Sequence, residues 1–115
     1  MREPSGQLDL EIVVRGEIGH PRAELRVAGE FDRLQVGRFD KAATALSEAI
    51  EQLTVDLSRT TIIDSAALGS LVRLRHALDR RGCTLRVVVA TPFQETVLRV
   101  SGLFDFLGVE VGDRP

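Results

Sequence analysis

The sequence predicts a small α/β domain: a mixed, mostly parallel β-sheet with an N-terminal hairpin and three main helices packed largely on one face. The chain has 115 residues, of which 43% are hydrophobic and 28% charged, the size and balance of one globular domain. Residues 8–14 and 23–27 alternate apolar and polar side chains, as half-buried strands do. Beyond residue 32, helical spacing alternates with short β-branched runs. This order favours parallel strands joined by right-handed helical crossovers.

The hairpin is expected first. Its first strand has apolar residues at every second position, Leu8, Leu10, Ile12 and Val14. The second strand repeats this pattern at Ala23, Leu25 and Val27. Gly16, Gly19 and Pro21 lie between the two runs, and these residue types mark a turn. Two alternating strands joined by a short turn predict antiparallel pairing.

A helix follows the hairpin. Its apolar residues are spaced by three and four, at Val36, Phe39, Ala43, Leu46 and Ile50. Asp32 stands before this run, so we expect it to cap the helix N-terminus. The short apolar and β-branched run 53–57 then predicts an interior strand, and residues 58–63 are expected to form a loop.

The second helix is expected to begin at Asp64-Ser65. Its apolar face consists of Ala67, Leu71, Leu74 and Leu78. Gly82 suits the position just after a helix end. A buried strand over residues 84–90 follows, because three consecutive valines lie within it.

The third helix carries several start signals. Thr91 can be the N-cap, Pro92 fits the first helical position, and Gln94 completes a capping box. Its apolar positions are expected at Phe93, Val97 and Val100. Residues 104–111 allow one last short strand. We therefore expect a flexible tail over residues 1–7 and a single domain over residues 8–115.

Composition argues against several classes of protein. The formal net charge is −2, which gives no strong field for nucleic acid or anionic membranes. The chain has five Phe and no Trp or Tyr, so it has few aromatic side chains on which nucleic-acid bases could stack. One Cys and two His cannot build an ordinary structural zinc site. No apolar run approaches the roughly 20 residues that span a bilayer. We expect a cytoplasmic protein with no cofactor, metal, nucleic-acid partner or membrane insertion.

No catalytic motif is evident. The phosphate-binding glycine loops, the zinc-protease motif and the nucleophile elbow are all missing from the sequence. His20 lies in a turn and His76 lies off the leucine face of the second helix, so both are expected to be solvated, and Cys83 has no partner base close to it in sequence. Glu30 and Asp32 form a carboxylate pair, but acid–base catalysis also needs groups that position a substrate. We expect no enzyme, and a small enzyme with a site around Glu30, Asp32 and Asp64 is the weaker alternative.

Asp64-Ser65 at a helix start allows two interpretations. The free N–H groups of a first helical turn and the positive end of its dipole favour a phosphate there, so Ser65 has the position of a phosphoacceptor. Alternatively, Asp64 or Ser65 serves only to cap the helix. Physical chemistry alone leaves both interpretations open.

Three short motifs stand in register over nearly the whole chain. They are Asp-Ser-Ala-Ala-Leu-Gly at 64–69 after Val-Asp-Leu-Ser at 55–58, Gly-Glu-Phe-Asp at 29–32, and Ser-Gly-Leu-Phe at 101–104. Together they resemble the signature of the STAS domain family, whose best-known soluble members are anti-sigma factor antagonists. The resemblance runs from about Leu8 to Val111 and implies a STAS-like fold.

The resemblance also implies a function. The unphosphorylated protein would bind an anti-sigma factor that is also a GHKL-type serine kinase, and so release a sigma factor. That kinase would use ATP and Mg²⁺ to phosphorylate Ser65, and a separate phosphatase would reverse the modification. The implied partner-binding surface consists of Glu30, Asp32, Asp64, Ser65 and Ala66. A STAS subunit of another assembly, such as a stressosome or a lipid-transport complex, is the alternative.

Two features depart from the family pattern. Ala66-Ala67 stands where relatives often have Ser or Thr and then Gly, which stiffens the first helical turn. The turn from Arg15 to Pro21 is also longer than is usual in the family.

Overall fold

The computed structural model describes residues 7–112. Its elements, in chain order, are β1 (Leu8–Glu17), β2 (His20–Phe31), α1 (Val36–Ser47), β3 (Gln52–Ile63), α2 (Ser65–Arg80), β4 (Thr84–Val89), α3 (Pro92–Val100) and β5 (Val109–Val111). The order agrees with the one expected from the sequence. Apart from Gln7, the expected N-terminal tail lies outside the described residues.

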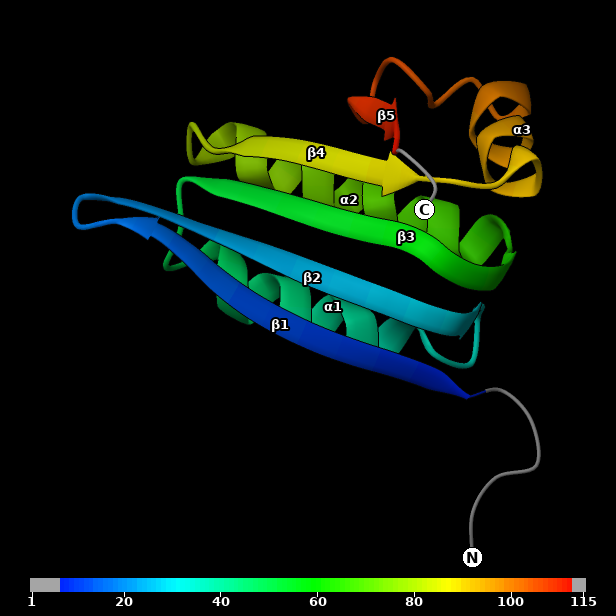
Figure 1. The fold of residues 1–115 in the computed structure, drawn as a ribbon, viewed down its shortest axis with the longest axis horizontal. Coiled ribbons are helices and arrows are strands. Elements are labelled where there is room, and N and C mark those ends of the chain that lie inside the picture. Colours follow the sequence, from blue (N-terminus) through cyan, green and yellow to red (C-terminus); the bar gives the residue numbers. More distant parts are fainter. Residues whose placement is uncertain (1–6, 113–115) are drawn as a thin grey trace, which may run out of the picture.

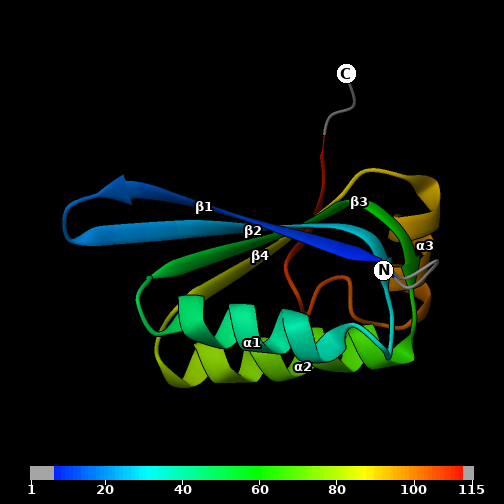
Figure 2. The same ribbon diagram turned by 90° about the horizontal axis from the view of Figure 1, so that it is seen from below.

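The strands form one five-stranded sheet in the order β1-β2-β3-β4-β5. β1 and β2 pair antiparallel, and each later neighbour pairs parallel, so the mixed, mostly parallel sheet is confirmed. Helices α1 and α2 lie side by side under one face, and α3 lies beyond the carboxyl end of β4 (Figures 1 and 2). The β1–β2 hairpin projects past the sheet on the opposite side from α3 (Figure 2).

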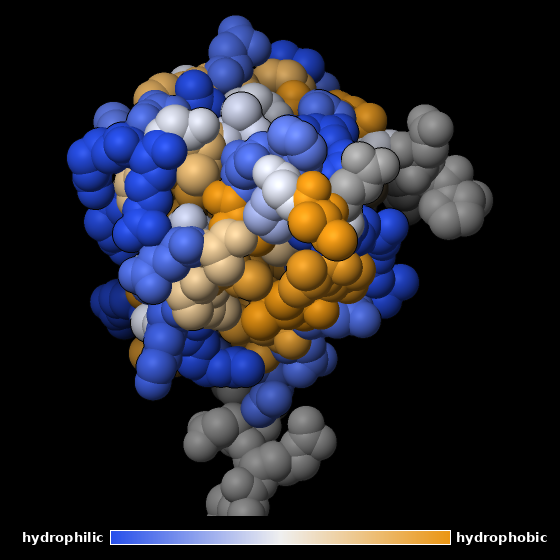
Figure 3. Space-filling model, turned by 90° about the vertical axis from the view of Figure 1, so that its left-hand side faces the viewer, coloured by the Kyte–Doolittle hydropathy of each residue, from blue (hydrophilic) through white to orange (hydrophobic). Residues whose placement is uncertain are grey.

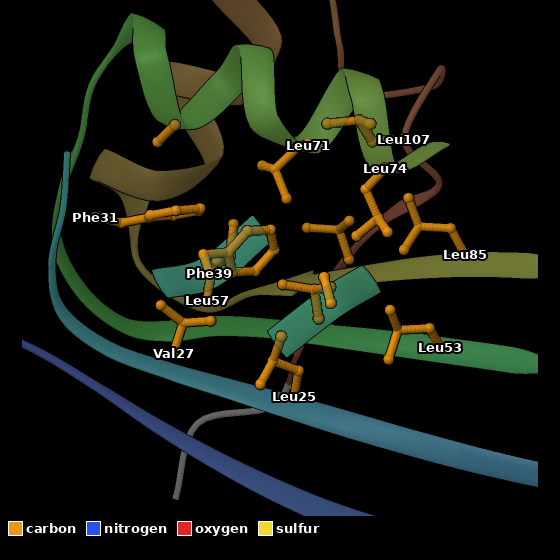
Figure 4. Packing of buried hydrophobic residues seen from close by; sticks show 14 of the residues in the cluster. Leu25, Val27, Phe31, Phe39, Leu53, Leu57, Leu71, Leu74, Leu85 and Leu107 are labelled. Carbon is orange, nitrogen blue, oxygen red and sulfur yellow. The ribbon is translucent and has the colours of Figure 1, made fainter. Parts of the chain in front are cut away.

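The hydrophobic core fills the space between the sheet and the two helices (Figure 4). Alternate residues of the central strands point into it, among them Leu25, Leu53 and Val87, and none of these is more than 6% exposed. Phe31 at the end of β2 and Phe39 in α1 are fully buried, with ring centroids 4.7 Å apart. Contact between these two rings packs the end of β2, near residues 29–32, against α1.

The hairpin is longer and less covered than the sequence indicates. Its strands pair up to Glu17 and His20, which leaves a two-residue turn at Ile18-Gly19 in place of the expected longer turn. Along β1 the apolar pattern is only partly buried. Leu8 is 2% exposed, but Ile12 is 50% and Val14 is 69% exposed. Alternation therefore identified the strand correctly, but it did not show that helices cover only part of its length.

Residues 58–63 form a strand and not the expected loop. β3 runs on to Ile63 and pairs with β2, with register shifts between Arg26 and Ala28 and between Gly29 and Glu30 of β2. Each shift adds a residue on the β3 side, which bends a strand and increases its twist. We call residues 57–62 the bulged segment of β3.

The buried face of α3 also differs from the expected one. Phe93 is 49% exposed and Val100 is 82% exposed, whereas Gln94 and Leu98 are fully buried. The helix starts as expected, with the Thr91 and Gln94 capping box and Pro92 in its first turn. Within residues 7–112, no helix is both long and apolar enough to cross a membrane.

Candidate functional site

The candidate site lies where β2 and β3 end side by side. Phe31 is the register partner of Ile63, so Asp32 and Asp64, which follow them, leave the sheet at neighbouring points. Parallel pairing places the carboxyl ends of both strands at one edge of the sheet, and α2 begins there. This brings the 29–32 and 64–69 motifs together although they are separated by a whole helix and strand.

Asp64 holds two segments together. Its Oδ1 accepts a hydrogen bond from the backbone N–H of Ala67 at 2.9 Å, so Asp64 is the N-cap of α2. Its Oδ2 accepts the backbone N–H of Arg33 at 2.9 Å, in the segment between β2 and α1. One carboxylate therefore fixes both the start of α2 and the segment after Asp32. The capping interpretation is confirmed for Asp64 and leaves the Ser65 hydroxyl outside the cap.

Ser65 is the first residue of α2 and is exposed to solvent. Ala66 beside it is half-buried, and Ala67 is fully buried against the core. The methyl group of Ala67 therefore packs inward, so the departure from the family's Gly faces the core. The first turn of α2 therefore exposes Ser65 between the capping residue Asp64 and the buried Ala67.

Other hydroxyl groups nearby differ in access. Ser70 is 1% exposed and donates to a carboxylate oxygen of Asp40 in α1. Ser58 is half-buried in the bulged segment of β3. Thr61 is exposed, and its hydroxyl donates to the carbonyl of Gly29 at 3.3 Å. By exposure, Thr61 is the strongest alternative acceptor to Ser65.

Asp32 does not cap α1 as expected. Helix α1 begins at Val36, and Gln35 occupies its N-cap position without a side-chain cap. Asp32 instead accepts the backbone N–H of Leu34 on Oδ1 at 3.1 Å, while its own carbonyl accepts from Gln35 and Val36. Such a local turn competes with helix capping because a short Asp side chain reaches the N–H two residues ahead. Asp32 therefore shapes the turn that lies against Asp64.

Gly29 and Glu30 precede this turn in β2. Gly29 has a φ of 101°, and a Cβ there would lie 2.5 Å from the carbonyl oxygen of Gln7. Only glycine therefore fits where β2 shifts its register. Glu30 is half-buried and alternates with buried Phe31, so it lies on the sheet face turned away from the helices. Of the expected partner-binding residues, Asp32, Asp64, Ser65 and Ala66 lie together, and Glu30 lies on the other side of the strand end.

Gln94 also holds this end of the molecule together, although its sequence context indicates only a capping box. Its Oε1 accepts the N–H groups of Ala90 and Thr91 at 2.8 and 3.0 Å. Its Nε2 donates to the carbonyls of Ser58 and Thr60 at 3.0 and 2.9 Å. The fully buried amide thus ties the bulged segment of β3 to the start of α3. A single glutamine near a helix start gives no sequence signal for a contact 34 to 36 positions away.

Exposed apolar side chains surround the polar residues. Leu34 is 75%, Ile62 is 40% and Phe93 is 49% exposed, and each lies in a segment at the carboxyl ends of the strands. Arg33 and Arg59 are exposed in the same segments. Among the described residues, no three His, Cys, Asp or Glu side chains gather to hold a metal ion. This end offers an exposed hydroxyl, carboxylates and apolar groups, which suits binding to another protein.

Comparison with known proteins identifies the family. A family model described as "Mlab, STAS domain" matches residues 15–108, which is most of the chain. The chain therefore belongs to the STAS domain family, as its motifs predicted. No curated protein sequence matches it.

Solved structures give the same fold. An anti-sigma factor antagonist from Mycobacterium paratuberculosis superposes with a TM-score of 0.73 at 20% identity, over 88% of this chain and 85% of that one. SpoIIAA in its unphosphorylated form gives 0.73 at 21% identity, over 94% and 90%. The phosphorylated form of SpoIIAA, described as a Bacillus cell fate determinant, gives 0.68 at 18% identity, over 94% and 93%. The chain thus has the STAS fold found in anti-sigma factor antagonists.

Proposed function

We propose that this protein is an anti-sigma factor antagonist whose binding is switched off by phosphorylation at Ser65. In its unphosphorylated form it binds an anti-sigma factor that is a GHKL-type serine kinase, and the bound sigma factor is released. The observation that carries the proposal is the exposed Ser65 at the first position of α2, beside a carboxylate that fixes both adjoining segments. The protein is the substrate of the kinase and performs no catalysis itself.

The proposed switch follows from charge. The Ser65 oxygen attacks the γ-phosphorus of ATP held by the kinase, ADP leaves, and the hydroxyl proton passes to a base on the kinase. The phosphate adds between one and two negative charges at neutral pH next to Asp64 and Asp32. The first turn of α2 tolerates this charge because of its dipole. A partner surface that accepts carboxylates and a neutral hydroxyl does not accept the added charge equally well, so the complex weakens. A phosphatase restores the binding form.

Phosphorylation of the purified protein by candidate anti-sigma kinases, followed by mass spectrometry, tests this proposal. We expect one phosphate on Ser65, and Ser65→Ala should abolish it while leaving the circular dichroism spectrum and anti-sigma binding intact. Thr61→Ala is the matched control, because Thr61 is also exposed and lies near the same strand end. A phosphate that persists in Ser65→Ala and disappears in Thr61→Ala would reject the assignment.

A STAS subunit of another assembly, such as a stressosome or a lipid-transport complex, is the second candidate. The matched family model supports it, because its description names a STAS domain without an anti-sigma factor. The genes beside the coding sequence distinguish the two: a kinase or sigma factor gene favours the first candidate, and a transporter permease gene favours the second. A small enzyme around Glu30, Asp32 and Asp64 is less well supported. Both oxygens of Asp64 and one of Asp32 accept backbone N–H groups.

A further inference from the structure

The outer edge of β1 has no neighbouring strand among the described residues, since β1 is the first strand of the sheet. The carbonyl of Gln7 accepts the N–H of Glu30 at 2.9 Å. In an antiparallel pair, the backbone groups of successive residues alternate between the partner strand and the opposite side. Leu8, Leu10, Ile12 and Val14 therefore direct their N–H and C=O groups toward the open edge.

The open segment has two defined limits. At its start, the Arg38 guanidinium of α1 donates a hydrogen bond to the carbonyl of Leu8. This carbonyl is therefore already bonded and is not open to another strand. At its end, Gly16 has a φ of 102°, which departs from strand geometry. Regular, open edge therefore extends from Leu10 to Val14, with Ile12 at its centre.

The same segment exposes apolar side chains. Leu10, Ile12 and Val14 are register partners of the buried residues Val27, Leu25 and Ala23, and so lie on the helix side of the sheet. No helix in the described part of the chain covers the far part of β1: Ile12 is 50% and Val14 is 69% exposed. The surface at this end of the molecule, viewed toward the hairpin, shows a broad apolar area (Figure 3). An open edge that is also apolar is a template for another strand.

We propose that a second copy of this chain covers this edge. The two β1 strands pair antiparallel about a two-fold axis through Ile12, which joins the two five-stranded sheets into one. Ile12 then faces Ile12 of the second copy, and Leu10 faces Val14, so the outward backbone groups pair and apolar side chains meet.

Charge complementarity supports this register. On the helix-free face, the axis through Ile12 sets Asp9 of each copy opposite Arg15 of the other. An axis through Glu11 would instead set Glu11 against Glu11, which is unfavourable. In the proposed register Glu11 faces Val13, and Glu11 keeps its ion pair with Arg26 at 3.4 Å.

The pairing closes as a dimer. The other edge of the sheet is β5, which has only three residues, so residues 7–112 offer one long open strand per chain. A two-fold contact uses this surface once and leaves no long edge for a third copy. Because one strand pair buries less area than a standard interface, the dimer should depend on concentration. The centre of the dimer contact, Ile12, pairs with Leu25 of β2. Leu25 lies six residues before Phe31 at the end of β2, which is about 20 Å along the strand. The Ser65 end therefore stays accessible in the dimer.

Sedimentation equilibrium of the purified protein over a wide concentration range tests the proposal. We expect a monomer–dimer equilibrium with no larger species. Ile12→Lys should weaken dimerisation at least about tenfold, because it places a charge where two apolar side chains meet. Ile18→Lys is the matched control: Ile18 is fully exposed at the hairpin tip, outside the open segment. Its dimerisation should equal that of the unchanged chain.

A charge exchange tests the register. Asp9→Arg and Arg15→Asp should each dimerise poorly alone, because like charges then face one another. Mixing the two variants should restore a heterodimer, since both opposed pairs again have opposite charge. The proposal is overturned if the unchanged chain stays monomeric at every concentration, if Ile12→Lys dimerises normally, if the mixture does not associate, or if open-ended aggregates form in place of a dimer.

Discussion

At the Ser65 end of the molecule, polar side chains hold backbone groups in place, whereas at the hairpin end apolar side chains are left in water. Asp64, Asp32 and Gln94 together bind backbone groups from four separate segments. The hairpin has ordinary strand pairing up to Glu17 and His20, but Ile12 and Val14 are at least half exposed and Ile18 is fully exposed. The first end is positioned by internal contacts, and the second leaves surface that another chain can bury. The difference indicates that the two ends have separate roles.

The largest expected effect of breaking the polar end comes from Gln94→Leu. Leucine fills a similar volume but leaves the N–H groups of Ala90 and Thr91 and the carbonyls of Ser58 and Thr60 without this partner. We expect the free energy of unfolding to fall by about 3 kcal/mol, measured by urea denaturation. The matched change at the hairpin end, Val14→Ala, should cost less than about 0.5 kcal/mol because Val14 is largely exposed. Equal losses for the two variants would contradict the comparison.

Asp64 should have the next largest effect. Asp64→Ala removes both backbone hydrogen bonds, and we expect a loss of about 2 kcal/mol in unfolding free energy. In Asp64→Asn an NH₂ group replaces one of the two carboxylate oxygens. The side chain can therefore accept from the N–H of Ala67 or of Arg33, but not from both. About half of the loss should therefore remain in the asparagine variant. A loss as small as that of an exposed surface substitution would show that Asp64 does not join the two segments.

Asp32 separates stability from binding. Asp32→Asn keeps an oxygen that can accept from the N–H of Leu34, so the melting temperature should change by only a few degrees. If the carboxylate contacts a basic group on the anti-sigma factor, affinity should fall by about 1.5 kcal/mol, the scale of a hydrogen bond to a charged group. Isothermal titration calorimetry of the unchanged chain and of Asp32→Asn against the anti-sigma factor measures this affinity. Unchanged affinity would limit Asp32 to its structural role in the turn.

The smallest effect is expected at the far edge of the sheet, where an ion pair joins β4 and β5. Arg86 of β4 donates two hydrogen bonds to Glu110 of β5, at 2.8 and 2.6 Å. The hydrogen bonding by Arg86 holds the pKa of Glu110 below its ordinary value. A lowered folded-state pKa stabilises the fold above the unfolded value of about 4.3, and this contribution is lost as pH falls through the folded pKa.

Thermal denaturation of the unchanged chain and Glu110→Gln at neutral and acidic pH tests this effect. The unchanged chain should be slightly more stable at neutral pH, and the difference should vanish in acid. Both side chains are about half exposed, so added salt should also reduce the difference. A difference that grows as pH falls would reverse the expected sign.

Local chemistry in the sequence predicted much of this structure. The capping box of Thr91 and Gln94, the capping by Asp64 and the period-two strands depend on residues a few positions apart, and all three are present. The motifs around residues 29–32 and 64–69 also indicated the family correctly. Each of these predictions needed only local spacing or a short pattern.

The predictions that failed depended on distant contacts. Residues 58–63 form a bulged strand and not a loop, because they pair with β2, and Gln94 of α3 binds two of their carbonyls. Asp32 shapes a turn and does not cap α1, and Phe93 lies outside the buried face of α3. In each case the local signal was compatible with two outcomes, and packing between elements selected one.

The sequence by itself determined the order of elements, their type and the capped start of α2, because neighbouring residues set these features. Only the tertiary structure decided that Asp64 also binds Arg33, that Gln94 fixes the bulged segment, and that half of β1 remains uncovered. These features depend on which strand ends meet and how far the helices extend along the sheet. The periodicity of a single strand carries no information on either, since it records which side chains share a face and not what lies above that face.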